Sequence, residues 1–249
     1  MQITLGLPEP REFSSLPRLR LIQSGIKRTY SKHTPSSTRL RLPVTPAILH
    51  KIRDQWATKS TERDTVMLWA GTVLCFFGFF RSGELTVPTL SFYDQSTHLS
   101  WGDIAIDNPH APQLLKIRSK RSKTNQFGNG VDVYVGKTGD DLCPVTALIA
   151  YMTVREPEEG CFFKFGDGKP LTKAKFTQHV RLALEAAGLS YQHFAGHSFR
   201  IGAATAAAKA GIEDSMIRTM GRWNSTAFLA YIRTPQEHLA QISKLLTNS

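Results

Sequence analysis

Four residues in the last third of the chain have the types and spacing needed to act on a phosphodiester. His197 and Arg200 lie three positions apart, Trp223 ends a Gly-Arg-Trp sequence, and Tyr231 lies in Ala-Tyr-Ile-Arg. Covalent cleavage of a phosphodiester requires a nucleophile, positive charge beside the non-bridging oxygens and an acid for the leaving oxygen. The phenol, the guanidinium and the indole N–H meet the first two requirements, and the imidazole could take up the proton of a phenol whose pKa is normally about 10.

Each of these residues also has an ordinary structural alternative. The spacing places His197 and Arg200 on one face of an Ala-rich helix, where they could form a simple surface pair. Trp223 could belong to the core, and Tyr231, three residues after Phe228, could lie at its rim. No single residue of the four is diagnostic.

A second set of charged residues lies far upstream. Arg81 ends an apolar run, and Glu84 follows it in Arg-Ser-Gly-Glu, so a carboxylate could orient the guanidinium. Lys120, Arg121 and Lys123 form a basic turn between two expected strands and are expected to point outward. The alternatives are a cation that stabilises a helix C-terminus and solvated charges in a hairpin.

The composition indicates a polyanionic partner. The 249 residues carry a formal net charge of +11, with a pI near 9.8, which favours nucleic acid over a basic but otherwise ordinary soluble protein. Three scattered cysteines with no Cys-x-x-Cys pair argue against a zinc site or a disulfide framework. No signal peptide is evident, and the apolar run at 66–80 is too short for a membrane span, so we expect a buried helix there.

The chain divides into two regions by composition. Residues 1–41 are strongly basic and read as a short helix over 16–27, a linker over 29–37 and an extended strap. This basic region looks like the tail of a longer upstream segment, and the alternative is a solvated flexible arm. It is expected to contact the DNA backbone through Lys27, Arg28, Lys32, Arg39 and Arg41, with Lys120 and Arg121 adding contacts from the hairpin.

Residues 42–249 are expected to form a mainly α domain with a small three-stranded antiparallel β-sheet. Thr45 and Pro46 suit a helix start, and Gly188 and Gly211 suit helix ends. The hydrophobic pattern predicts helices over 47–56, 64–80, 145–153, 172–187, 197–210, 213–220, 225–232 and 235–246, and strands over 99–106, 114–117 and 131–135.

In order and phrasing, these residues resemble the tyrosine recombinases, the phage-integrase family. The resemblance runs from about residue 16 to the end, and it is similar in detail to a eukaryotic branch carried by DIRS/Ngaro-type retroelements and Crypton-like transposons. The motifs that carry it are Phe-Phe-Gly-Phe-Phe-Arg-Ser-Gly-Glu-Leu (76–85), Ser-Lys-Thr-Asn-Gln-Phe (122–127), Leu-Cys-Pro-Val (142–145), Gly-His-Ser-Phe-Arg-Ile-Gly-Ala-Ala-Thr (196–205) and Gly-Arg-Trp…Tyr-Ile-Arg-Thr-Pro (221–235).

The resemblance implies a role for each residue in site-specific DNA recombination or integration. Tyr231 would be the nucleophile of a 3′-phosphotyrosine intermediate, and Arg81 and Arg200 would clamp the scissile phosphate. Lys123 would protonate the leaving 5′ oxygen, with Lys120 the weaker candidate. The remaining residues would assist: His197 with the tyrosine proton, Trp223 with a phosphate oxygen, and Glu84 as support. No metal or other cofactor is implied.

The resemblance also implies partners and a cell compartment. Double-stranded DNA would be the substrate, self-association would give a tetramer on DNA, and a eukaryotic mobile element would act in the nucleus. The stripe Leu239, Ile242, Leu245 and Leu246 could dock on a neighbouring protomer or pack on its own domain. Trp223 and Tyr231 are eight positions apart, one fewer than in most phage and bacterial relatives. The resemblance further implies that residues 1–41 are the remnant of an N-terminal DNA-binding domain with its basic linker, and that 42–249 form the catalytic domain. We therefore expect most of the N-terminal clamping domain to be absent here.

Two other functions remain open from the sequence. A type IB topoisomerase shares the tyrosine chemistry and would relax supercoiled DNA without site preference. A domesticated DNA-binding module would bind DNA without cutting it, although all six expected active-site positions are filled.

Overall fold

The computed structural model describes residues 41–57, 62–120 and 130–233. The helices predicted over 16–27 and 235–246 lie outside these ranges, as do Lys27, Arg28, Lys32, Arg39, Arg121 and Lys123 and the stripe Leu239, Ile242, Leu245 and Leu246. Within the described ranges the chain is mainly helical with one small antiparallel sheet, so the predicted fold class is confirmed.

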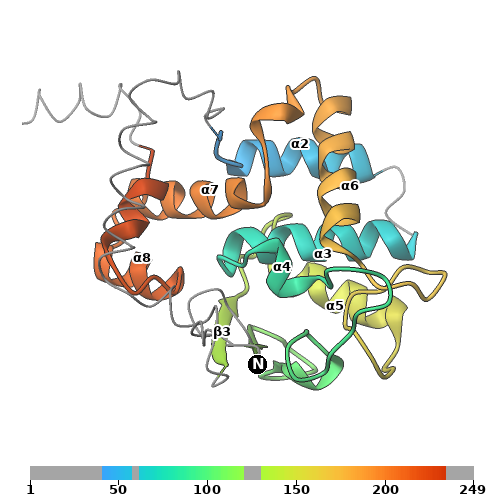
Figure 1. The fold of residues 1–249 in the computed structure, drawn as a ribbon. Coiled ribbons are helices and arrows are strands. Elements are labelled where there is room, and N and C mark those ends of the chain that lie inside the picture. Colours follow the sequence, from blue (N-terminus) through green and yellow to red (C-terminus); the bar gives the residue numbers. More distant parts are fainter. Residues whose placement is uncertain (1–40, 58–61, 121–129, 234–249) are drawn as a thin grey trace, which may run out of the picture. The chain divides into compact units, whose positions relative to one another are not determined.

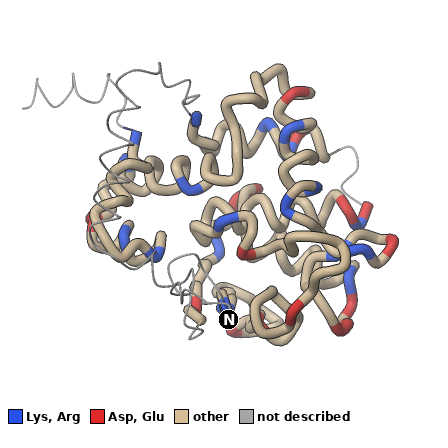
Figure 2. Tube along the Cα trace, in the orientation of Figure 1, with Lys and Arg blue, Asp and Glu red and all other residues tan. Residues whose placement is uncertain are grey.

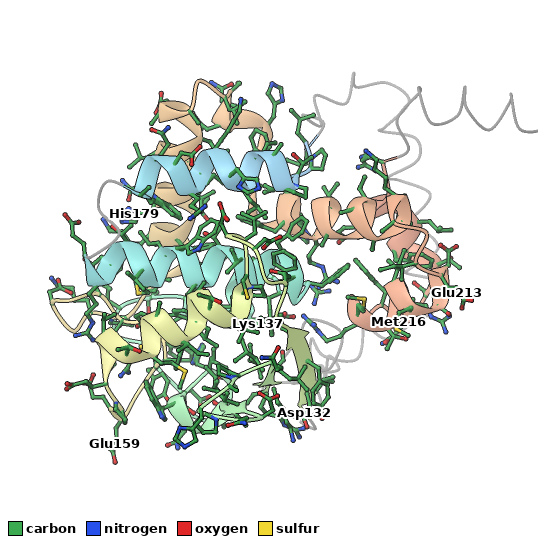
Figure 3. The ribbon with its side chains drawn as sticks, turned by 180° about the vertical axis from the view of Figure 1, so that it is seen from behind. Asp132, Lys137, Glu159, His179, Glu213 and Met216 are labelled. Carbon is green, nitrogen blue, oxygen red and sulfur yellow. The ribbon has the colours of Figure 1, made fainter. Side chains whose placement is uncertain are left out.

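Three helices lie one above another at the centre of the fold. Figures 1 and 3 show α3 (Arg63–Phe77) between α2 (Pro46–Ala57) and α5 (Pro144–Arg155). Ten of the fifteen residues of α3 are buried, which confirms the predicted core helix. Across the described segments, no helix combines the length and the apolar character that a membrane crossing demands.

The sheet packs its apolar side against the core. Strands β1 (Ile104–Ile106), β2 (Leu114–Ser119) and β3 (Val131–Gly136) pair antiparallel in that order. Leu115 pairs with Val135 and Ile117 with Val133, and all four side chains are buried. Buried side chains therefore alternate along β2 and over the second half of β3, as the two-residue period of a strand requires.

The remaining helices follow the predicted order. They are α6 (Lys173–Ala186), α7 (Gly196–Lys209), α8 (Asp214–Met220) and the 3-10 helix η4 (Thr226–Tyr231), with short 3-10 turns η2 (Trp101–Asp103) and η3 (Tyr191–His193). Figure 3 shows α8, which carries the labelled Met216, below the end of α7; the labelled Glu213 directly precedes this helix. Gly188 and Gly211 take φ values of 74° and 75°, as expected of residues that end helices.

Three predicted elements differ from the structure. The central helix ends at Phe77, not Phe80, because Phe79 adopts a φ of 50° and turns the chain. Arg81 therefore does not close that helix; it precedes the short helix α4 (Ser82–Leu85). Only 104–106 of the strand predicted over 99–106 forms a strand, since 101–103 make a 3-10 turn, and the last described helix is 3-10 rather than α.

The segment that leads into α2 crosses α7, the helix that carries His197 and Arg200. Leu42 N–H donates to the His193 carbonyl and Val44 N–H to the Ser198 carbonyl, both at 2.9 Å. Val44 passes so close to Gly202 that a Cβ atom on this glycine would lie 1.8 Å from the Val44 carbonyl oxygen. A glycine is thus required where the two segments cross.

We predict that Gly202→Ala lowers the free energy of unfolding by about 3 kcal/mol or more, because backbone atoms cannot yield to the added methyl group. The expected drop in melting temperature is roughly 6 °C or more, measured by thermal unfolding. Gly136→Ala is the matched control, since a Cβ atom at Gly136 meets nothing within 4 Å. Equal melting temperatures for the two variants would contradict the packing argument.

Candidate active site

Arg81 and Glu84 form a rigid pair at one side of the site. The Arg81 guanidinium donates to Glu84 Oε1 at 3.0 Å, and the Arg81 backbone N–H donates to Glu84 Oε2 at 3.1 Å. The Glu84 side chain is only 4% exposed, whereas that of Arg81 is 19% exposed. The carboxylate therefore holds the guanidinium in place while part of it faces solvent.

Arg200 lies at the centre of the site and is fully buried. Its terminal nitrogens donate to the Phe79 and Gly221 carbonyls, each at 2.6 Å. Burial lowers the pKa of Arg200 to about 9, and the positive charges of Arg81 and Arg222 contribute. The group remains cationic at neutral pH, and among the described residues its Nε has no hydrogen-bond partner.

The Tyr231 hydroxyl lies beside an imidazole of its own chain. Its oxygen is 3.4 Å from His197 Nδ1, close enough for a proton to pass after a small adjustment. His197 is exposed at the start of α7, and Tyr231 is half-buried at the end of η4. Thr205 holds that end, because its hydroxyl donates to the Tyr231 carbonyl at 3.3 Å and accepts from the Arg233 N–H at 3.0 Å.

Trp223 packs between the central arginine and the tyrosine. The Arg200 guanidinium carbon is 4.4 Å from the indole centroid, and the Tyr231 ring centroid is 5.0 Å from it. Trp223 is 7% exposed, and within the described ranges its Nε1 has no hydrogen-bond partner. A buried indole N–H without a partner is costly, so it is suited to an acceptor supplied by a ligand.

The charges at the site do not balance. Arg81 and Arg222 both form ion pairs with Glu84, and among the described residues Arg200 forms no ion pair. Three guanidiniums thus surround a single carboxylate. Buried charge without compensation is unfavourable, so the site favours a bound anion with acceptor oxygens, as in a phosphodiester.

The site opens into a cleft of about 730 Å³. Arg81 and His197 line it, together with Lys173 and Thr177 from the first turns of α6. Figure 2 shows basic residues along α6, which contributes Lys173, Lys175 and Arg181. A strand that entered this cleft would therefore meet positive charge beyond the central arginines.

Two residues from the predicted DNA-binding set lie within the described ranges. Lys120 does not point outward as expected: its ammonium contacts Asp103 at 2.6 Å and donates to the Gln95 and His98 carbonyls at 2.7 and 3.2 Å. Arg41 donates to the Gln192 carbonyl at 2.9 Å. Lys120 directly follows β2, and its ammonium is therefore held by residues of the same domain at the base of the hairpin.

Sequence reasoning missed two residues that shape the site. Arg222 pairs with Glu84, and Thr205 fixes the backbone of the tyrosine. Both lie inside motifs quoted above, Gly-Arg-Trp and the 196–205 stretch. Their partners are distant in sequence, so no local pattern indicated the contacts.

The structure resembles the catalytic domains of tyrosine recombinases. One match is the XerH site-specific recombinase bound to palindromic difH substrate, with a TM-score of 0.60, 16% identity, and coverage of 85% of this chain and 55% of that one. Another is a lambda integrase dimer bound to a COC' core site, with a TM-score of 0.54, 18% identity, and coverage of 80% and 49%. These likenesses confirm the predicted catalytic-domain fold.

Sequence comparison points the same way. An integrase/recombinase XerD homolog of Selenomonas ruminantium is 26% identical over 175 residues, covering 66% of this chain and 44% of the homolog. No family model matches. The chain thus spans less than half of this relative and about half of the XerH and lambda chains. In fold and in sequence, the chain is thus similar to the tyrosine recombinases and integrases.

Proposed function

We propose that the chain is a site-specific DNA recombinase that cuts and rejoins DNA through a 3′-phosphotyrosine intermediate. The observation that carries the proposal is the Tyr231 hydroxyl, 3.4 Å from His197 Nδ1 and next to a cluster of three guanidiniums with one carboxylate. A nucleophile, a proton acceptor and an anion site are thus supplied by a single chain.

The chemical step follows from these positions. The Tyr231 oxygen attacks the phosphorus, its proton passes to His197, and a phosphotyrosyl bond forms as the bond to the 5′ oxygen breaks. Arg81 and Arg200 stabilise the charge on the non-bridging oxygens, and the Trp223 N–H donates to one of them. Attack by a 5′ hydroxyl on the phosphotyrosine reverses these events and rejoins a strand.

Lys123 is proposed as the acid that protonates the 5′ oxygen. A 5′-bridging sulfur should make this acid unnecessary, because a thiol has a pKa of about 8.5 and leaves without a proton. We expect Lys123→Ala to slow cleavage of ordinary DNA by roughly 10² to 10⁴-fold and to recover on the sulfur-containing substrate, measured as single-turnover rates.

Lys120→Ala is the matched control for that measurement. Since Lys120 forms an ion pair with Asp103, its loss should lower the melting temperature and slow both substrates alike. If instead only Lys120→Ala regained a wild-type cleavage rate on the sulfur-containing substrate, Lys120 and not Lys123 would be the acid.

Trapping the covalent intermediate tests the proposed function. A nicked suicide substrate containing the target sequence should give an SDS-resistant protein–DNA adduct, with the DNA attached to the tyrosine peptide that contains residue 231. DNA binding without any adduct would instead indicate a module that does not cut. Relaxation of supercoiled plasmid without site preference would indicate a type IB topoisomerase.

The finer origin and setting are also proposals. The motif phrasing and the eight-position interval between Trp223 and Tyr231 support a eukaryotic mobile-element source of the DIRS/Ngaro or Crypton type. Action in the nucleus and assembly into a tetramer on DNA follow from that source. Sedimentation with and without target DNA, and the localisation of a tagged chain, would test these points.

A further inference from the structure

Arg222 occupies a backbone conformation that its residue type disfavours. Helix α8 ends in a Schellman motif, in which Arg222 N–H donates to the Thr219 carbonyl and Trp223 N–H to the Arg218 carbonyl, each at 3.0 Å. The residue after the C-cap in this motif is usually glycine, yet here it is Arg222, with a φ of 56°. A bulky residue in this left-handed backbone conformation costs roughly 1–3 kcal/mol. The neighbouring residue, Gly221, would adopt the conformation without that cost, yet the chain adopts it one position later.

The Arg222 side chain offsets this strain through contacts with the first half of the site. Its terminal nitrogens donate to Glu84 Oε2 at 2.8 Å, the Gly78 carbonyl at 3.0 Å and the Phe79 carbonyl at 3.1 Å. The guanidinium carbon lies 4.9 Å from the centroid of the Phe80 ring. The Arg222 side chain is 8% exposed, so most of the group faces the protein, not the cleft.

These contacts join two halves of the site that are far apart in sequence. Glu84 also holds Arg81, and the Phe79 carbonyl also accepts from Arg200. Trp223 follows Arg222 directly, and its ring lies 4.4 Å from the Arg200 guanidinium carbon. Glu84 therefore holds the Arg222 guanidinium, and this contact fixes the backbone that carries the Trp223 indole N–H.

We infer that Arg222 is a positioning residue for DNA cleavage, which acts by placing the Trp223 indole N–H against the scissile phosphate. The inference rests on the proposed function. Both terminal nitrogens of Arg222 are engaged by Glu84 and backbone carbonyls, and its Nε is buried, so we assign Arg222 no direct contact with the phosphate. A lysine could not replace it, since an ammonium lacks the planar fork that reaches these acceptors together.

The test uses Arg222→Gly, because glycine suits the left-handed position and keeps the helix end. We expect its single-turnover cleavage rate at saturating DNA to fall by roughly 10²-fold, the scale that a small misplacement of a reacting group can cause. DNA affinity should match that of Arg218→Ala, the control, which removes one positive charge from an exposed position of the same helix. The Arg218→Ala rate should stay near that of wild type.

A double-variant comparison separates positioning from a general loss of structure. If Arg222 acts through Trp223, then Arg222→Gly combined with Trp223→Phe should be no slower than the slower single variant. Losses that multiply would overturn the inference, as would an Arg222→Gly rate within about threefold of wild type.

Folding is monitored by circular dichroism and melting temperature. If Arg222→Gly does not fold, the cleavage rate of Arg222→Lys is measured in its place. A folded lysine variant that cleaves more slowly than wild type supports the inference, and a folded one that cleaves at the wild-type rate overturns it. An unfolded lysine variant would also overturn it, because the arginine would then be a stability residue. A wild-type chain that forms no adduct would refute the proposed function itself, whereas an active wild type with an equally active Arg222→Gly would refute this inference alone.

Discussion

Tyr231→Phe is expected to abolish the covalent adduct while it leaves the fold intact. The change removes the oxygen that must bond to phosphorus, so cleavage should fall by on the order of 10⁴-fold or more. The ring contacts with Trp223 and His197 remain. The lost hydroxyl contact with His197 is long, at 3.4 Å, so the free energy of unfolding should change by less than about 1 kcal/mol.

Adduct yield on a suicide substrate measures this effect, and DNA affinity is measured in parallel. Tyr134→Phe is the matched control, because Tyr134 is exposed on β3 and lies outside the cluster. Adduct formation by Tyr231→Phe at the wild-type rate would assign the nucleophile to another residue.

Arg200→Met should lower the cleavage rate by roughly 10³-fold or more, the scale seen when an arginine that stabilises a phosphoryl transition state is removed. Methionine keeps the length of the side chain and removes its charge. The Gly221 carbonyl loses its hydrogen bond from Arg200, whereas the Phe79 carbonyl still accepts a hydrogen bond from Arg222. Removal of an uncompensated buried charge offsets part of that loss, so the variant should fold.

Single-turnover rates at saturating DNA separate this loss from weaker binding. A methylphosphonate at the scissile position, which lacks one negative charge, should narrow the gap between wild type and Arg200→Met. An equal gap on both substrates would contradict an electrostatic role for Arg200.

A mixture of the two variants shows which chain supplies the nucleophile. Tyr231 lies beside His197 of its own chain and packs against Trp223, next to Arg200, so each chain holds its own tyrosine together with the proposed proton acceptor and the central arginine. A mixture of Tyr231→Phe and Arg200→Met should thus remain inactive. Restored cleavage would mean that the tyrosine of one chain enters the site of another.

The helices were predictable because local signals mark both their faces and their ends. The Thr45–Pro46 start and the Gly211 end depend on capping and backbone preference within a few residues. The end of α3 was not predictable in this way. The apolar run continues to Phe80, and only the turn at Phe79 separates helix from loop.

The residues of the site were predictable as types, but their connections were not. Motif order singles out Arg81, His197, Arg200 and Tyr231, and the structure brings these four residues into one cluster. The ion pair between Arg222 and Glu84 joins positions 138 residues apart. Local preference favours Gly221 as the left-handed residue, yet Gly221 has a φ of −79°, and Arg222, which pairs with Glu84, takes the left-handed conformation.

The packing of Trp223 on Gly221 has a consequence for sequence variation among relatives. A Cβ atom at Gly221 would lie 1.6 Å from Trp223 Cζ3, so any side chain there would displace the indole from the site. The two positions should therefore vary together: chains that keep a tryptophan at 223 retain the glycine. A smaller ring at 223 would remove the steric reason for a glycine, and an alignment of relatives would then show other residues at 221.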